Sequence, residues 1–344
     1  MIKVRLQGGL GNQMLQYAFA RSLTHRGYQV GLDANWNYVS LSHFKAARKK
    51  LKNAANNGGG GQTDNQNIVR SNTNAYVRNL ELARLNITLP IFCNNPTQPL
   101  ARYHFFYRRI MQRLPLRYTS LLYFFLNIPH LGASPKLLEK FTSHYTFHPR
   151  TYFTGFFMDT IYFNDIKSIL HKEFRPKSTS HKTAQLQKQI ASTQDSVFLH
   201  IRRGDFLLSQ NWKYTKLGSA YYNGSLRLII QKLKNPTIFV FSDDLAWCKA
   251  SLLSYLDADI SSKAKFIFIG NGNQANAIED LLLMYSCQHA IVANSTFSFW
   301  GAYLINNPQK IICAPAQYVW SGEGSEWYPK SWHKIDVHWG YELP

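Results

Sequence analysis

Acidic residues are scarce in this sequence of 344 residues. It has 19 Asp and Glu against 39 Lys and Arg, which gives a formal net charge of +20. Such an imbalance predicts attraction to an anionic partner, which can be a nucleic acid, a phosphorylated ligand or an acidic membrane. The charge alone does not choose among these three.

Cysteine is also scarce, with four residues and no C-x-x-C spacing. We therefore expect reduced or buried thiols and no disulfide framework. The histidines show no H-E-x-x-H or related spacing, so no metal site is predicted. A nucleic-acid partner is not expected either, because no RNP-like signature accompanies the basic residues.

Long apolar runs are missing as well. The most apolar window, Leu121 to Gly132, contains Pro129 and is shorter than the roughly 20 residues that a membrane span needs. Residues 1–7 contain no apolar core typical of a signal peptide. We therefore expect a cytoplasmic protein, with peripheral contact to the inner face of the cytoplasmic membrane as a further expectation.

What is present indicates a large folded chain. Hydrophobic residues make up 45% and aromatic residues 15%, which excludes global disorder. The length favours two domains, which we place at 1–150 and 151–344. A Gly/Asn-rich loop is predicted at 53–67, after a basic run at 45–52. Arg102, Arg109 and Arg113 share one face of a predicted helix, and that face is either solvated or binding.

The N-terminal segment predicts a strand, a glycine turn, a helix and a second strand. The strands are expected at 2–6 and 30–33, and the helix from about 12 to 25 with Gly27 after its end. The turn Gly8-Gly-Leu-Gly11 lacks the third glycine of a dinucleotide-binding motif and the Lys-Ser/Thr of a P-loop. Its bare backbone still suits a close approach to a phosphate or sugar. An oxidoreductase that uses Asp33 is a competing interpretation.

The second half alternates strand-like and helical patterns, which implies a mostly parallel sheet. Strands are expected at 196–201, 237–242, 265–269, 290–293 and 310–313. Helices are expected at 221–233, 245–255, 275–287 and 299–305.

Polar segments follow the predicted strands. They are Arg202-Arg-Gly-Asp205, Ser242-Asp-Asp244, Gly270-Asn-Gly-Asn273 and Asn294-Ser-Thr-Phe-Ser298. The carboxyl ends of parallel strands lie along one edge, where ligands bind, so these segments should converge. Paired arginines suit phosphate oxygens, a helix start binds anions, and a carboxylate such as Asp243 suits a base edge. Together they predict a site for a nucleoside diphosphate.

Structural roles for the same residues stay open at this point. Arg203 and Asp205 can form a local ion pair, and Ser295 or Thr296 can simply cap a helix. Asp257-Ala-Asp259 imitates a D-x-D metal site, but it follows a helical pattern instead of a strand, so we discount it.

Three segments resemble the signatures of bacterial α-1,2-fucosyltransferases of glycosyltransferase family 11. They are Gly8–Ala20, His200–Asp205 and Asn294–Ala302. Phe241-Ser-Asp-Asp244 and Tyr152-Phe-Thr-Gly155 fit the same pattern. The resemblance implies a GT-B-like pair of Rossmann-type domains facing across a cleft, with the acceptor on the N-terminal side. It also implies inverting transfer from GDP-β-L-fucose to the 2-hydroxyl of a galactoside, in an oligosaccharide or an O-antigen-like polysaccharide.

The resemblance also assigns roles by position. The diphosphate falls to Arg202 and Arg203, with Arg202 stabilising the leaving phosphate. The guanosine falls to His200 and to Asp243, with Asp244 as the alternative carboxylate. The remaining donor-binding positions are Gly9, Gly11, Ser295, Thr296, Phe297 and Ser298. Asn12 is expected in the catalytic cleft, and Asp205 is either the general base or the partner of an arginine. No cofactor or essential metal is expected.

Overall fold

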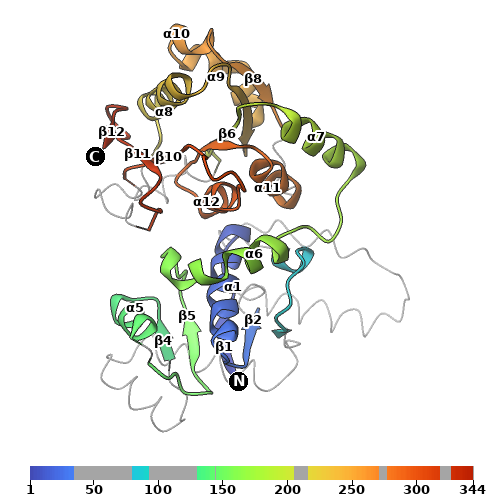
Figure 1. Cartoon of the computed structure of the whole chain (residues 1–344), viewed down its shortest axis with the longest axis vertical. Coiled ribbons are helices and arrows are strands. Elements are labelled where there is room, and N and C mark those ends of the chain that lie inside the picture. The colour runs from blue at the N-terminus through green and yellow to red at the C-terminus, as the bar shows by residue number, and fades with distance from the viewer. Residues whose placement is uncertain are drawn as a thin grey trace, which may run out of the picture. The chain divides into compact units, whose positions relative to one another are not determined.

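The computed structural model describes residues 1–34, 80–92, 130–143, 145–204, 216–270, 277–317 and 327–343. The chain forms two compact units (Figure 1). The first comprises residues 1–9, 23–80 and 89–155, and the second comprises residues 10–22, 81–88 and 156–344. The predicted basic run, the loop at 53–67, the arginines at 102–113 and Asp205 lie outside the described residues.

The first unit is built on a five-stranded sheet with the order β3-β2-β1-β5-β4. Every neighbouring pair in it is parallel. Its strands are β1 (Ile2–Arg5), β2 (Val30–Asp33), β3 (Ile91–Phe92), β4 (His130–Gly132) and β5 (Tyr152–Thr154). Ser134 is the N-cap residue of helix α5 (Pro135–Thr142), and its hydroxyl accepts the Leu137 N–H. The carboxylate of Asp33 is buried and accepts the Tyr152 hydroxyl at 2.7 Å, so it has a structural partner.

Helix α1 (Leu10–His25) leaves β1 through Gly8, whose φ of 81° suits glycine. It ends before Gly27, whose φ is 91°, as predicted. Through residue 22 the helix belongs to the second unit. There the carboxylate of Glu173 in α6 (Lys167–Glu173) accepts hydrogen bonds from Tyr17 at 2.6 Å and Arg21 at 3.0 Å. Burial, followed by Glu173, raises the pKa of Tyr17 to about 12, so this anchor stays protonated in neutral solution.

The second unit contains a seven-stranded sheet with the order β12-β11-β10-β9-β6-β7-β8. Its strands are β6 (Ser196–Ile201), β7 (Thr237–Ser242), β8 (Lys265–Phe268), β9 (His289–Ile291), β10 (Ile312–Pro315), β11 (His333–Ile335) and β12 (Glu342–Leu343). All pairs are parallel except β11 with β12. All six β6 side chains are buried, as expected for the centre of a doubly covered sheet.

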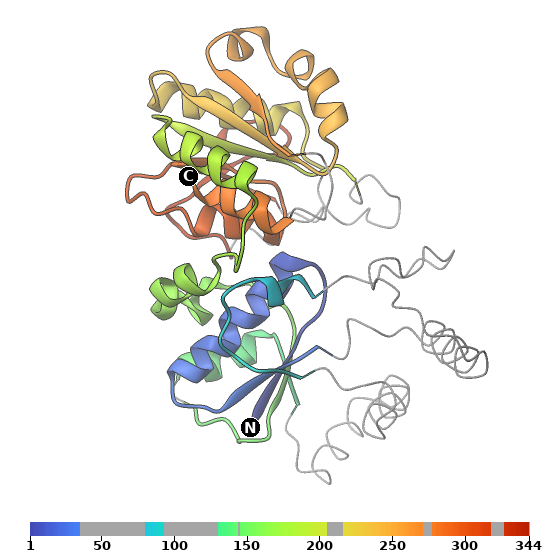
Figure 2. The same cartoon turned by 90° about the vertical axis from the view of Figure 1, so that its right-hand side faces the viewer.

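Helices cover both faces of this sheet (Figures 1 and 2). They are α7 (His181–Ser192), α8 (Ser219–Lys232), α9 (Leu245–Tyr255), α10 (Ala258–Ser261), α11 (Ala277–Tyr285) and α12 (Thr296–Tyr303). Buried residues of α8, α9 and α10 share a core with Val197, Leu199 and Ile201 of β6. On the opposite face, α12 packs against α11, and Phe198 of β6 lies beside Gly301 of α12. Three short 3-10 helices complete the described elements, at Glu81–Arg84, Thr160–Tyr162 and Asn164–Ile166.

The predicted α/β fold class is confirmed, with a parallel sheet in the first unit and a mostly parallel sheet in the second. Helix α12 begins three residues earlier than predicted, because Ser295, four positions after the end of β9, already takes extended N-cap geometry. Strand β10 begins two residues later than predicted, where its pairing with β9 and β11 sets in. Strand β5 pairs with β1, so the first sheet continues past the predicted domain boundary at residue 150. That boundary stays a prediction.

The structure also bears on the predictions about cysteine and about long apolar runs. Cys248, Cys287 and Cys313 are buried free thiols, as predicted for these three. Within the described ranges, no helix combines the length and hydropathy needed to cross a bilayer.

Candidate functional site

The second sheet has a topological switch point beside its central strand. From β6 the chain proceeds to β7 and β8 on one side, and later to β9, β10 and β11 on the other. Crevices at the carboxyl ends of strands that diverge in this way are the usual ligand sites of open α/β sheets. The segments that follow β6, β7 and β9 are those in which the sequence predicted a nucleotide site.

Two aspartates after β7 hold the two arginines after β6. The Arg202 guanidinium forms an ion pair with Asp243, with Nη1 and Oδ2 3.2 Å apart. The other Asp243 oxygen accepts the Arg203 backbone N–H at 2.9 Å. Asp244 Oδ2 accepts Arg203 Nε at 3.1 Å. The predicted residues therefore converge, and the aspartates orient the arginines.

The Arg203 guanidinium also stacks on an aromatic ring. Its Cζ lies 3.7 Å from the ring centroid of Trp247, in the first turn of α9. Asp244 caps the same helix, because its Oδ1 accepts the Trp247 N–H at 3.2 Å. Trp247 lies outside the predicted motifs, and its spacing from Asp244 predicts a capped backbone N–H but not the stacking on Arg203.

His200 is buried close to the end of β6. Its ring lies 5.8 Å from that of Phe297 in the first turn of α12, which links the β6 end to this helix. Its Nδ1 has no hydrogen-bond partner within the described part of the chain. Burial, followed by the Arg202 charge, lowers the pKa of His200 to about 3, so the imidazole is neutral at physiological pH.

The depressed pKa of His200 predicts a loss of stability in acid. Between about pH 6.5 and 3 the unfolded imidazole binds a proton that the folded one does not, so stability falls as the pH is lowered through this range. From pH 7 to pH 5 we expect wild type to lose about 2 kcal/mol more unfolding free energy than His200→Gln. Urea unfolding of both proteins at the two pH values measures this difference. Equal losses would contradict it.

The first turns of α1 and α12 are in direct contact. A Cβ on Gly11 would lie 2.4 Å from Phe297 N and 2.6 Å from the Thr296 carbonyl carbon. The Thr296 hydroxyl donates to Asn12 Oδ1 at 2.8 Å, and Trp300 Nε1 donates to the Gly11 carbonyl at 3.0 Å. Two helix N-termini, each a partial positive charge, thus adjoin the strand ends that carry the arginines.

The remaining predicted residues differ in what they can offer a ligand. The Ser295 side chain makes no capping hydrogen bond at the start of α12. Ser298 is fully buried and its hydroxyl accepts the Ala293 N–H at 3.0 Å, so it supports the turn between β9 and α12. Gly9 falls in the first unit, whereas Gly11 falls in the second. Asp205, the base candidate, is not among the described residues.

The discounted D-x-D segment has a structural explanation. Asp257 is the N-cap residue of α10 and forms an exposed ion pair with Arg227. Asp259 lies 3.9 Å from the same guanidinium. Both carboxylates therefore face one cation, the Arg227 guanidinium.

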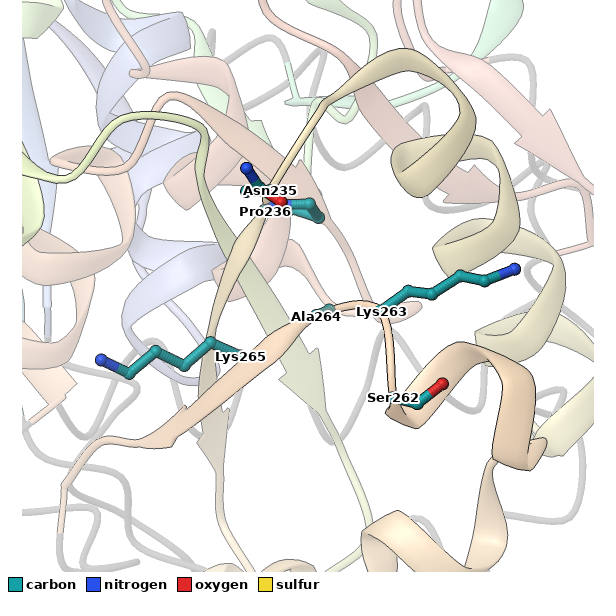
Figure 3. A pocket seen from close by; sticks show the side chains of 6 residues that line it. All are labelled: Asn235, Pro236, Ser262, Lys263, Ala264 and Lys265. Carbon is teal, nitrogen blue, oxygen red and sulfur yellow. The ribbon is translucent and has the colours of Figure 1, made fainter.

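A hollow of about 330 Å³ lies at the other edge of the sheet (Figure 3). It is lined by residues that precede or begin β7 and β8, namely Asn235, Pro236, Ser262, Lys263, Ala264 and Lys265. It belongs to the amino ends of the strands. The hollow is therefore separate from the candidate site, which lies at the carboxyl ends of the strands.

Known proteins resemble the chain at two levels of coverage. It is 29% identical over 348 residues to an alpha-1,2-colitosyltransferase of Escherichia coli, which covers 98% of this chain and 99% of that protein. It is 29% identical over 159 residues to the galactoside 2-alpha-L-fucosyltransferase Sec1 of Mus musculus, covering 44% of this chain and 41% of that one. The O-antigen biosynthesis glycosyltransferase WbnK of Escherichia coli is 28% identical over 148 residues, covering 42% and 46%.

Among solved structures, the alpha-1,6-fucosyltransferase NodZ soaked with GDP-fucose is similar over 94% of this chain and 96% of its own, at 14% identity and a TM-score of 0.46. A likeness this distant adds nothing on the ligand. The family resemblance of the sequence motifs is confirmed over nearly the whole chain, because the glycosyl transferase family 11 model matches residues 1–336. The chain therefore belongs to glycosyl transferase family 11, and it is a glycosyltransferase.

Proposed function

We propose that this glycosyltransferase transfers L-fucose from GDP-β-L-fucose to the 2-hydroxyl of a galactoside, with inversion at the anomeric carbon. One observation carries the proposal. In a chain of family 11, two oriented arginines and the first turns of two helices adjoin the switch point of a parallel sheet. Such a cluster of positive charge and N–H groups suits a diphosphate.

The guanosine part of the donor would lie near the end of β6. His200 suits it because the imidazole is neutral and its Nδ1 lacks a partner among the described residues. Both predicted carboxylates already contact an arginine, but the Asp244 side chain is 35% exposed, against 9% for Asp243. We therefore favour Asp244 for the base edge and give Asp243 the role of orienting Arg202.

In the proposed reaction the acceptor 2-hydroxyl attacks the anomeric carbon from the face opposite the phosphate. The bond between that carbon and the β-phosphate oxygen breaks, GDP leaves with the electron pair, and the hydroxyl proton passes to a base. Arg202 stabilises the charge that grows on the phosphate, an effect that is often the largest in catalysis. Asn12 accepts a hydrogen bond from the Thr296 hydroxyl. It is not the base, since an amide does not take up the proton. Asp205 stays the predicted base.

The transferred sugar has a second candidate, because a relative that matches nearly the full length is named an alpha-1,2-colitosyltransferase. Colitose is 3-deoxy-L-fucose, so the two donors differ by one hydroxyl. Assays with a lactose-type acceptor and either GDP-fucose or GDP-colitose, each alone and then in competition, distinguish the two donors. We expect GDP release with GDP-fucose and an α-linked product by NMR. Turnover with GDP-colitose alone would assign the second candidate, and release with neither donor would refute both.

Metal independence is a further prediction for the proposed reaction. Cationic side chains and helix N-termini take the place of a divalent cation at the leaving phosphate. EDTA at millimolar concentration should leave the initial rate within twofold of the untreated enzyme, with or without added Mg²⁺. A loss of activity in EDTA that Mn²⁺ or Mg²⁺ restores would contradict this prediction.

The net charge of +20 exceeds what one nucleotide requires. We propose that the excess attracts the protein to an anionic membrane surface, where lipid-linked acceptors would be found. Vesicle sedimentation should show binding to phosphatidylglycerol-containing liposomes at low salt and release at about 0.5 M salt, where exposed charges are screened. Binding should be absent with neutral phosphatidylcholine vesicles. Failure to bind the anionic vesicles would refute the membrane proposal and leave the enzyme assignment untouched.

A further inference from the structure

We propose that Trp247 is a positioning residue that holds Arg203 in the geometry needed to bind the donor diphosphate. The proposal rests on the proposed function, in which Arg203 binds that diphosphate. It assigns a role to an aromatic residue outside the motifs that predicted the site.

Arg203 is held by three contacts with residues that follow β7. Its Cζ lies 3.7 Å from the Trp247 ring centroid, and its Nε donates to Asp244 Oδ2 at 3.1 Å. Its backbone N–H donates to Asp243 Oδ1 at 2.9 Å. All three contacts come from Asp243, Asp244 and the first turn of α9, so one short stretch of the chain holds both the backbone and the guanidinium of Arg203.

The supports of Arg203 are themselves held in place. Asp244 Oδ1 accepts the Trp247 N–H at 3.2 Å, and the Asp244 N–H donates to the Ser242 hydroxyl at 2.9 Å. The Trp247 ring meets Tyr255 edge to face, with centroids 5.5 Å apart. One carboxylate therefore caps the helix with one oxygen and orients the arginine with the other.

The contacts leave the end of the guanidinium open. Nε is engaged by Asp244 and one face is covered by Trp247, whereas Nη1 and Nη2 have no acceptor among the described residues. The Arg203 side chain is 26% exposed, so a ligand can reach it. The two N–H-bearing ends of the guanidinium lie in one plane and match two phosphate oxygens. An arginine that is already held in place loses less rotamer freedom on binding than a flexible one, and so binds the diphosphate more tightly.

A purely structural role for the stack makes different predictions. If Trp247 only fastens the loop after β6 to α9, its loss lowers stability without changing affinity for the diphosphate. If Trp247 instead stacks on the guanine base, its loss weakens GDP binding but not pyrophosphate binding. Cation–π contacts are worth about 0.5–2 kcal/mol, which corresponds to roughly 2- to 30-fold in affinity.

Calorimetric titration of the full-length protein with GDP and with inorganic pyrophosphate tests these roles. We expect Trp247→Leu to raise the Kd of both ligands about tenfold. Trp247→Phe, which retains an aromatic face, should raise them less than threefold. Trp339→Leu is the matched control, since Trp339 is 78% exposed on the turn between β11 and β12. Far-UV circular dichroism and the melting temperature identify any variant that does not fold.

A double-mutant cycle links the effect to Arg203. Arg203→Gln should weaken GDP binding at least as much as Trp247→Leu, and the double variant should add less than twofold to Arg203→Gln. Additive effects, unchanged affinities in a folded Trp247→Leu variant, or a loss confined to GDP would each overturn the inference and leave the proposed function intact. Wild-type protein that binds no GDP would overturn both.

Discussion

Arg202→Lys should lower kcat/KM for the donor about 100-fold, the magnitude typical of removing one group that stabilises transition-state charge. Lysine keeps the positive charge but loses the planar fork, and it cannot reproduce both the ion pair with Asp243 and a forked contact to phosphate. Because charge develops on the phosphate as the bond breaks, kcat should fall more than the affinity for GDP. Initial rates over a range of donor concentrations, together with calorimetric GDP binding, separate the two.

The control for this prediction is the same substitution at an exposed arginine. Arg227 is 49% exposed and pairs with Asp257 on the surface, so Arg227→Lys should change kcat/KM less than twofold. An Arg202→Lys enzyme that turns over at the wild-type rate would remove Arg202 from the mechanism. An equal loss in both variants would attribute the effect to folding instead of chemistry.

Gly11→Ala should destabilise the protein by about 3 kcal/mol and abolish most of its activity. The added methyl group would sit 2.4 Å from Phe297 N, and a backbone atom cannot move aside by changing rotamer. Helices α1 and α12 would have to separate at their first turns. The intrinsic preference of a helix for alanine over glycine, about 1 kcal/mol in the opposite direction, makes this a stringent test.

The matched control for Gly11 is Gly218, the N-cap residue of α8. A Cβ there would meet only Tyr255 Oη, at the ordinary contact distance of 3.7 Å. Gly218→Ala should therefore cost about 1 kcal/mol or less. Urea unfolding and initial rates of both variants make the comparison. A Gly11→Ala protein with wild-type stability would show that the contact between the two helices is not tight in solution.

Much of the second sheet was predictable from the sequence, because strands and helices alternate there with clear patterns. Helix α9 was placed at its observed bounds, Leu245–Tyr255, and β6 at Ser196–Ile201. The two-residue strands β3 and β12 were not predicted. Such short strands form because neighbouring strands supply their hydrogen bonds, and that information is not local.

The order of residues along the chain already shows which residue types follow the strands, and a parallel sheet necessarily brings the ends of β6, β7 and β9 to one edge. It also determined the family, through motifs distributed over both halves of the chain. The sequence did not determine which residues pair with one another at this edge. Asp243 pairs with Arg202, and Asp244 divides its two oxygens between Arg203 and α9. The family motif had assigned the guanosine to Asp243, with Asp244 as the alternative carboxylate.

The need for glycine at position 11 and the contacts of Trp247 become visible only in the folded chain. Gly11 lies against Phe297, 286 positions away in sequence, and its missing side chain lets two helix ends meet. Arg203 follows β6, and Trp247 lies in the first turn of α9, which follows β7. The two residues meet because β6 and β7 are neighbours in the sheet. The chemistry of each side chain can be read from the sequence. Its interaction partner, however, depends on strand order and helix packing, and these depend on contacts between distant segments of the chain.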